Sequence, residues 1–572
     1  DLHTEVHSFP TRRSSDLMES DNAYMYPAGF SIFALDNSNI NGNDLEMGKT
    51  QVLTSPSYGI LQFEGNDLNI QNSNFNNLDR AIQNDWSNFK NYNISENLFT
   101  DCKTGIEWWE SVSENIAKIN NNTFEASLDI NNHPIYSNLE AIHIFGGSRD
   151  FPFSVFENQI TNHLVGVFAM NLKGKAFDQF IRNNQISLTF DEDYINSISF
   201  QFRGISLQNC DYIKVLQNDI EWTLNHSDNG SLVEGIRFET CKFSLFSDNN
   251  LTNLQRGIYA AGTCEETAIL CNNMDKCYPS GMYFDAVDLP SQGTNCGGGG
   301  NMWLGDYNNT PSYVYKIDEG LPGPQIKWYY LGSNSPLNPL YPSPFKGNVV
   351  LPQLASNLCF PEFPCGFLNG NNQDRYYQGD SIFRENYIQK IIQDSISYNF
   401  YPNENKYYDR EYAVNVLLED SNFVINNVYN QFLQAIDQEN IIKIKETSTL
   451  LKSGEVNLAY IKNNSILYRN VIEQNINDVN SILLIKLVND DLSPFNNSQK
   501  NTLSNIAYQP AMLGGNGVFN ARSLLKLRIE DGASSMRNNS NLNNEKISKV
   551  LAFAYPNPSN EFFYIKTNNS EL

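Results

Sequence analysis

A short phrase recurs eight times between residues 60 and 284, and it limits the possible folds more than any other feature of the chain. The phrase is Asn, any residue, then a large apolar residue, and successive phrases start 23 to 36 residues apart. Repeats of this length are typical of solenoids, in which each unit packs only against its neighbours. The phrases start at Ser73, which takes the place of Asn in the first copy, and at Asn97, Asn122, Asn158, Asn184, Asn218, Asn249 and Asn272.

Each phrase is followed by a small residue and then an aliphatic one, as in Gly204-Ile205. Apolar and polar residues alternate before each Asn, which favours strands over helices. We therefore expect each repeat to form one coil of a right-handed parallel β-helix, with strands of successive coils about 4.8 Å apart. The Asn would lie at a bend, accept left-handed backbone geometry and stack into a ladder of amides.

This pattern resembles the β-helix repeats of pectate-lyase-like and related surface proteins over residues 60–284. The resemblance implies the right-handed parallel β-helix and leaves the activity open, because one fold carries many functions.

Changes of pattern along the chain predict six segments and a mainly β fold class. The helical segment shows a period near four and breaks near Gly454, Pro494 and Gly514-Gly515, which predicts four to six helices. The segments are 1–20, a non-native scar or tail; 21–300, the β-helix; 301–375, an irregular cap or connector; 376–530, an α-helical domain; 531–552, a linker; and 553–572, the start of a small β-sandwich.

The last segment carries the turn Tyr555-Pro556-Asn557-Pro558 ahead of an apolar strand, after a linker rich in Asn and Ser. It resembles the opening of the C-terminal sorting domain on cargo of the type IX secretion system in Bacteroidetes-type bacteria. The resemblance implies that this machinery is a partner and that the protein is secreted or held on the outer cell surface. Only the first part of such a domain is present, and residues 1–20 match no pattern of the repeat, so we expect a longer protein at both ends.

Net charge, apolar runs and cysteine spacing limit the kinds of partner and compartment that suit this chain. The formal charge is 39 − 64 = −25, which disfavours nucleic acid, since that partner needs a basic footprint. No run of 18 apolar residues occurs, so the sequence predicts no transmembrane helix. Among nine cysteines there is no CxxC pair. Cys359 and Cys365 flank a short loop and are a disulfide candidate, whereas Cys210, Cys241 and Cys264 share one phase of the repeat and would stack on neighbouring coils.

Candidate binding residues follow from the repeat. If the aliphatic residue of each pair points inward, the next residue points outward, and we call these positions the outward row. Charges mixed with aromatic rings favour contact with a polysaccharide; an ordinary solvated strand face is the alternative. The row is Gln83, Glu107, His143, Phe168, Ser206, Arg237, Tyr259 and Tyr283, and Glu107, His143, Arg237, Tyr259 and Tyr283 are the binding candidates.

Long loops leave the coils at one bend, and loops on a rigid scaffold often carry function. One of them contains Asp191 and Asp193, further binding candidates that could hold Ca²⁺ or be merely solvated; no other cofactor is expected.

Arg203, Glu234 and Arg256 fall one coil apart and should form cross-strand ion pairs. Glu140 and Glu234 lie three coils apart, about 14 Å, which is too far for a glycosidase carboxylate pair.

Three functions remain open. The first is a secreted or cell-surface protein for binding, adhesion or display, with polysaccharide contact. The second is a polysaccharide lyase or glycoside hydrolase, although no catalytic constellation identifies an enzyme. The third is a structural stalk that carries a helical interaction module. We favour the first.

Overall fold

The computed structural model divides the chain into two compact units, residues 1–529 and 530–572, which are described separately. The second unit contains one antiparallel pair, β34 (Phe553–Ala554) and β35 (Ile565–Lys566). The structure describes residues 28–35, 38–41, 44–46, 58–65, 67–85, 88–89, 91–109, 112–113, 115–133, 140–146, 153–172, 179–190, 201–224, 233–264, 267–278, 280–289, 292, 301–304, 326–330, 350–354, 388–395, 402–419, 427–436, 439–489, 494–527, 529, 553–554 and 565–566.

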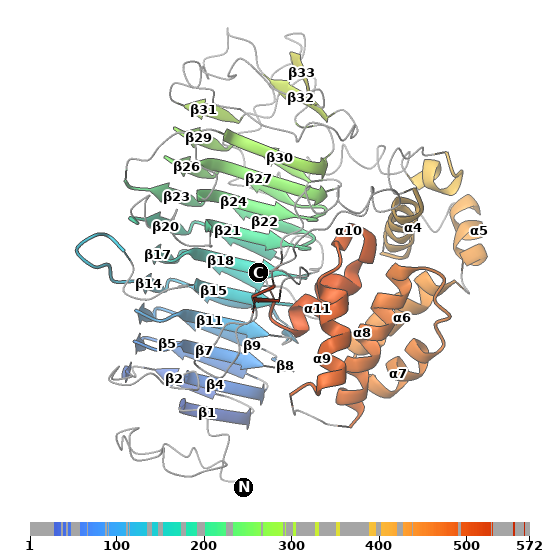
Figure 1. Ribbon diagram of the computed structural model, residues 1–572, viewed down its shortest axis with the longest axis horizontal. Helices are drawn as coiled ribbons and strands as arrows, with labels where there is room; N and C mark the ends of the chain where they lie inside the picture. The colour runs from blue at the N-terminus through green and yellow to red at the C-terminus, as the bar shows by residue number, and fades with distance from the viewer. Residues whose placement is uncertain are drawn as a thin grey trace. The chain divides into compact units, whose positions relative to one another are not determined.

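Three parallel sheets build the first part of the chain, and successive coils add one strand at a time to each sheet (Figure 1). Sheet A contains β1 (Ala28–Leu35), β4 (Tyr58–Gly65), β7 (Arg80–Asp85), β11 (Thr104–Trp109), β15 (Glu140–Phe145), β18 (Val165–Met170), β21 (Phe202–Gln208), β24 (Val233–Glu239), β27 (Arg256–Thr263) and β30 (Ser280–Asp288). Sheet B contains β2 (Ser38–Asn41), β5 (Asp67–Gln71), β9 (Asn91–Ser95), β13 (Ala117–Asn120), β16 (Phe153–Phe156), β19 (Gln179–Arg182), β22 (Ile213–Leu216), β25 (Leu245–Ser247) and β28 (Ala268–Leu270).

Sheet C contains β3 (Asp44–Glu46), β6 (Asn74–Asn76), β10 (Leu98–Thr100), β14 (Thr123–Glu125), β17 (Gln159–Thr161), β20 (Gln185–Leu188), β23 (Asp219–Trp222), β26 (Asn250–Thr252), β29 (Asn273–Asp275) and β31 (Met302–Leu304). Two short parallel pairs stand apart from these sheets, β8 (Asn88–Phe89) with β12 (Val112–Ser113) and β32 (Ile326–Tyr330) with β33 (Val350–Leu354). The chain therefore has a parallel, β-helix-like repeat architecture.

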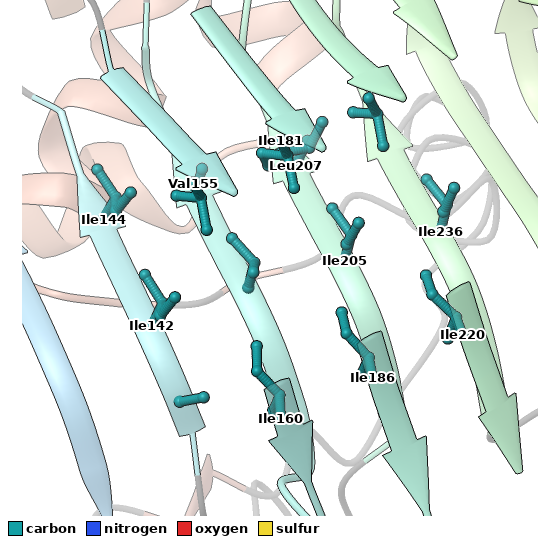
Figure 2. Close-up of a cluster of buried hydrophobic side chains, with 14 of the residues drawn as sticks. Ile142, Ile144, Val155, Ile160, Ile181, Ile186, Ile205, Leu207, Ile220 and Ile236 are labelled. Atoms are coloured by element: carbon teal, nitrogen blue, oxygen red, sulfur yellow. The ribbon is translucent and has the colours of Figure 1, made fainter. Parts of the chain in front are cut away.

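The apolar residue of each phrase points into the coil and stacks on its equivalent one coil away, as the sequence predicts. The rings of Phe75, Phe99 and Phe124 stack at 4.9 and 4.5 Å between centroids. Farther along, Ile160, Ile186 and Ile220 continue the same line (Figure 2). These side chains are buried and belong to one continuous core. Burial of the apolar surface of this core is the main driving force for the folding of the coils.

The repeated Asn residues form the predicted ladder. The side chain of Asn184 accepts from the backbone N of Asn158 at 3.1 Å and from its Nδ2 at 2.9 Å. Its own Nδ2 donates to the Val155 carbonyl at 3.0 Å and to Asn218 Oδ1 at 2.9 Å. The same pattern runs from Asn97 to Asn301. Because all of these amides are buried, each coil depends on its neighbours for hydrogen bonding as well as for packing.

One detail of the predicted bend is wrong. Left-handed geometry belongs to the residue before each Asn and not to the Asn itself. Positive φ angles occur, for example, at Asn183 (53°) and Gln217 (55°), just ahead of Asn184 and Asn218. The Asn can then turn its amide into the core while its predecessor makes the bend.

The small residue of the repeat makes room for the apolar residue of the next phrase. A Cβ atom added to Gly204 would lie 2.6 Å from Ile220 Cγ2 and 2.7 Å from the Gly235 carbonyl oxygen. Those distances are well inside van der Waals contact, so a larger residue would push adjacent coils apart.

The six cysteines that the structure describes divide into five free thiols and one disulfide-bonded residue. Cys102, Cys210, Cys241, Cys264 and Cys277 are buried free thiols, and Cys210 and Cys241 are close enough for their thiols to hydrogen bond. Burial raises the pKa of the Cys241 thiol well above its ordinary value, which disfavours the reactive thiolate at this position. Cys271 is in a disulfide whose partner lies outside the described residues. Cys359 and Cys365, the candidate pair, also lie outside them.

A helical module follows, after a helical turn at 388–392. It has eight helices in the described residues, more than the four to six expected, although the breaks near Gly454, Pro494 and Gly514-Gly515 are confirmed. The helices are α4 (Pro402–Glu419), α5 (Asn427–Ile436), α6 (Asn440–Lys452), α7 (Val456–Asn464), α8 (Val471–Val488), α9 (Asn497–Ala507), α10 (Ala511–Gly514) and α11 (Asn516–Leu524). Asn470 caps α8, and Asn496 with Gln499 forms a capping box on α9.

A buried histidine should make the coils sensitive to mild acid. Burial lowers the pKa of His163 to about 4, although the Thr161 carbonyl raises it in part. The unfolded chain binds this proton near pH 6.5, so stability should fall as the pH drops from 6.5 to 4, by up to roughly 3 kcal/mol. Urea unfolding at both pH values should show a smaller difference for His163→Gln. The matched variant, His133→Gln, should behave like the wild type; equal pH slopes for all three proteins would contradict this.

Candidate functional site

The outward row exists as a line of side chains in register on sheet A. Strand pairing places Glu107 opposite His143, His143 opposite Phe168, and Arg237 opposite Tyr259. Unlike an ordinary solvated strand face, the row is mostly buried. Gln83, Glu107, His143, Phe168, Ser206, Arg237 and Tyr259 are all buried, and only Tyr283 is half-exposed.

The cover over several of these positions comes from the end of the helical module. Trp109 Nε1 donates to the Ser523 carbonyl at 2.8 Å, and Ser523 Oγ donates to the Gly146 carbonyl at 2.6 Å. Asn171 Nδ2 donates to Asn520 Oδ1 at 2.7 Å. Trp109 also packs against both the α8–α11 core and the apolar cluster of Phe145, Val165, Phe168 and Met170. Helix α11 and the residues after it are therefore anchored on sheet A.

Glu107 is the charged centre of this anchor. Its carboxylate forms an ion pair with Lys526, 419 residues later in the chain, and another with Arg80 at 3.2 Å. The ammonium of Lys526 also lies 4.3 Å from the centre of the Trp109 ring. Burial alone would raise the pKa of Glu107, but Lys526 and Arg80 outweigh it and hold the pKa below its ordinary value. Glu107 is thus ionised and paired at neutral pH.

His143 and Glu140 form a dyad beside Glu107. Glu140 Oε2 lies 2.9 Å from His143 Nδ1, and the imidazole ring lies 4.6 Å from both Phe145 and Phe168. A carboxylate in this position fixes the orientation of an imidazole, as in many acid–base sites. The other nitrogen, Nε2, is buried and has no partner among the described residues. A substrate would reach it only after the aromatic surroundings opened.

Farther along sheet A, a buried carboxylate holds three arginines. Glu234 lies 3.4 Å from Arg203 Nε, 3.1 Å from Arg237 Nη1 and 2.8 Å from Arg256 Nη1. The predicted ladder of Arg203, Glu234 and Arg256 is therefore confirmed. Burial raises the pKa of Glu234, but the three guanidinium groups outweigh it and lower the pKa to about 2. Arg237 also pairs with Glu239, so this network is a structural clamp across coils.

The row ends in a stack of alternating cations and aromatic rings. The rings of Tyr259 and Tyr283 stack at 5.4 Å, with Arg237 3.8 Å from the first ring and Arg256 4.0 Å from the second. Tyr259 donates to Asp285 Oδ2 at 2.8 Å. Arg256, Tyr283 and Asp285 remain partly exposed. This end is the part of the row that solvent reaches.

The structure thus divides the predicted site residues into two groups. Glu107 and His143 lie together under the helical module, whereas Arg237, Tyr259 and Tyr283 form the stack. Glu140 and Glu234 are three coils apart, as expected. Asp191 and Asp193 lie outside the described residues, so the calcium prediction stays a prediction. Sequence reasoning did not find the partners of these residues.

The missed partners are Trp109, Glu239, Asp285 and Lys526. The first three lie two positions beyond the outward row on the same strands, so the alternation of a strand could have found them. No sequence pattern pointed to Lys526 as a partner of Glu107, because Lys526 lies in the helical module and outside the coil repeat.

No protein-family model matches this chain, and no curated protein matches it. Among the helices that the structure describes, none is both long and apolar enough to cross a membrane. The fold and the site define a class only: a parallel, β-helix-like repeat protein whose helical module is anchored on one sheet.

Proposed function

We propose that this chain is a secreted or cell-surface binding protein, built on a right-handed parallel β-helix that presents the helical module to a partner. The observation that carries this proposal is a group of exposed apolar side chains on that module. A partner that covers them would gain the free energy of burying apolar surface. The anchor at Glu107 and Trp109 would hold the module in place while it binds.

The exposed group gathers around the turn between α7 and α8, and we call it the α7–α8 patch. Its members are Leu458 (50% exposed), Ile461 (65%), Leu467 (78%), Tyr468 (51%) and Val471 (53%). Single exposed apolar residues are common on any protein, but several within fourteen residues of one helical hairpin are not. Such patches are typical of surfaces that bind other macromolecules.

A double variant of the patch tests this function. We expect Leu458→Lys/Ile461→Lys to lower the binding of fluorescently labelled protein to intact bacterial cells by at least tenfold, measured by flow cytometry. The matched control is Ile485→Lys, which replaces an exposed apolar residue near the other end of α8 and should bind normally. Unchanged binding by a folded double variant, or no cell binding by the wild type, would count against the proposal.

Two features support an extracellular location. In the sequence, Tyr555-Pro556-Asn557-Pro558 falls between the residues of β34 and β35, which pair antiparallel, and a β-sandwich sorting domain would contain such pairs. The disulfide at Cys271 suits an oxidising compartment. We therefore infer export by the type IX machinery. Release of the chain into the medium, and its loss in a strain that lacks this machinery, would be the direct test.

Polysaccharide contact is the second candidate function, and it is favoured by the exposed end of the stack. A tyrosine face next to a guanidinium and a carboxylate offers both apolar and polar contacts to a sugar. Tyr283→Ala should abolish binding on a glycan array if the stack is the site. Incubation with acidic and neutral glycans would separate binding from catalysis, since a lyase or hydrolase releases unsaturated or reducing ends and a binding protein releases neither.

A further inference from the structure

A cavity of about 310 Å³ opens within the helical module, apart from the outward row and the α7–α8 patch. It lies between the helical turn at 388–392, helices α4 and α5, and the residue that precedes α6. This volume is at the lower end of the range for small-molecule sites. The size suits a molecule no larger than an acylated amino acid.

One wall of the cavity is apolar. Ile391 and Ile436 are buried side chains at its surface, and Phe432 and Ala435 of α5 complete this wall. Phe432 packs against the clusters on both sides of α5, so the wall is fixed by the core of the module. An aliphatic or aromatic group placed here would leave water and gain the free energy of apolar burial.

The remaining lining carries three cations and three carboxylates, and four of these groups form two ion pairs. The third carboxylate, Asp409, is buried and is not free. Lys406 Nζ lies 2.6 Å from Asp394 Oδ2, and Arg410 Nη2 lies 2.9 Å from Glu439 Oε1. Lys406 and Arg410 are one turn apart on α4 and so face the same way. Both cations that α4 contributes to the lining are therefore held by carboxylates of the lining itself.

Lys390 is the remaining cation of the lining. It is exposed, and among the described residues its ammonium has neither an ion pair nor a hydrogen bond. A cationic group at the edge of an apolar wall selects a ligand with a negative charge at one end and an apolar group at the other.

We propose that this cavity binds a carboxylate attached to a compact apolar group, with the carboxylate on Lys390 and the apolar group against Ile391, Phe432 and Ile436. Two sources share this chemistry: a free N-acylated amino acid, and the C-terminal residue of a peptide. The site goes beyond the proposed surface binding, because it uses different residues and a different class of ligand.

Calorimetric titration of the full chain tests the proposal with N-acetyl-L-leucine as the probe. We expect saturable binding of one molecule per chain, at least tenfold tighter than the binding of N-acetyl-L-leucinamide, which lacks the charge, or of acetate, which lacks the apolar group. An acetylated Gly-Gly-Gly-Leu peptide with a free carboxylate separates the two sources. Tighter binding of the peptide than of N-acetyl-L-leucine assigns a peptide C-terminus, and weaker or equal binding assigns the free molecule.

Two variants locate the site. Lys390→Met should weaken the binding of N-acetyl-L-leucine at least tenfold, whereas Lys500→Met, which removes an exposed lysine of α9, should leave it unchanged. Ala435→Phe fills the cavity from an exposed position and should abolish binding in a folded protein, as judged by circular dichroism. Absence of saturable binding up to about 10 mM, equal binding of the amide, or full binding by both cavity variants would overturn the proposal.

Discussion

Replacing Asn184 by Ala should destabilise the coils by about 3–5 kcal/mol, among the largest effects expected for any single side chain here. The Asn184 amide bonds to three other residues: Asn158, Val155 and Asn218. Its loss leaves the backbone N–H of Asn158 and the carbonyl of Val155 without these bonds in a site that water does not reach. Each buried group left in this way costs about 1–3 kcal/mol.

Chemical unfolding can measure this effect, with the fluorescence of the buried Trp108 and Trp222 as the signal from the coils. Gln185→Ala is the matched control, because Gln185 lies next in the chain with its side chain exposed on sheet C, and it should change stability by less than about 0.5 kcal/mol. Asn184→Ser should fall between the two, since Ser occupies the equivalent place at Ser73. A loss below about 1 kcal/mol for Asn184→Ala would show that the ladder is not a main source of stability.

The second large effect is expected at Glu234. Glu234→Gln removes the charge that compensates Arg203, Arg237 and Arg256 while keeping the shape of the side chain. Breaking a buried ion pair from one side costs roughly 3–5 kcal/mol, because the remaining charges stay buried without compensation. A second replacement, Arg203→Met, should recover part of this loss, so the double variant should be less destabilised than the sum of the single ones.

The pH dependence of unfolding distinguishes this network from simple packing. The pKa of Glu234 is about 2 in the folded chain and near 4.5 when unfolded, so the folded state binds fewer protons between these values. Its contribution is fully present above pH 4.5 and is lost as the pH falls towards 2. Glu234→Gln should flatten this part of the stability curve, whereas Glu221→Gln on the exposed face of sheet C should not. Parallel curves for the wild type and Glu234→Gln would refute the assignment.

The repeat made the coils predictable from the sequence. The Asn phrase and the small-aliphatic pair have a fixed place in every coil, so counting from one to the other gives the register of sheet A. That count placed Arg203, Glu234 and Arg256 on adjacent coils and Phe75, Phe99 and Phe124 in one stack. It also separated Glu140 from Glu234 by three coils, as the structure has them.

The contact between the outward row and the end of the helical module could not be predicted from the repeat. Alternation along a strand distinguishes the two faces of a sheet, but it cannot show whether the outer face meets water or another part of the chain. Glu107 and Lys526 are 419 residues apart, and neither the coil repeat nor the helical period links them. The helix count was too low because two of the breaks, between α5 and α6 and between α7 and α8, contain neither Gly nor Pro.

Cross-linking between Asn171 and Asn520 tests most directly whether α11 is anchored on the outward face of sheet A. Their side chains meet at 2.7 Å, so Asn171→Cys/Asn520→Cys should be joined by a short bismaleimide within one chain, as detected by mass spectrometry of the linked peptides. Asn171→Cys/Asn464→Cys, with its second position at the end of α7, is the control. We predict near-complete linkage of the first pair and little of the second; equal, low linkage of both would contradict the anchored arrangement.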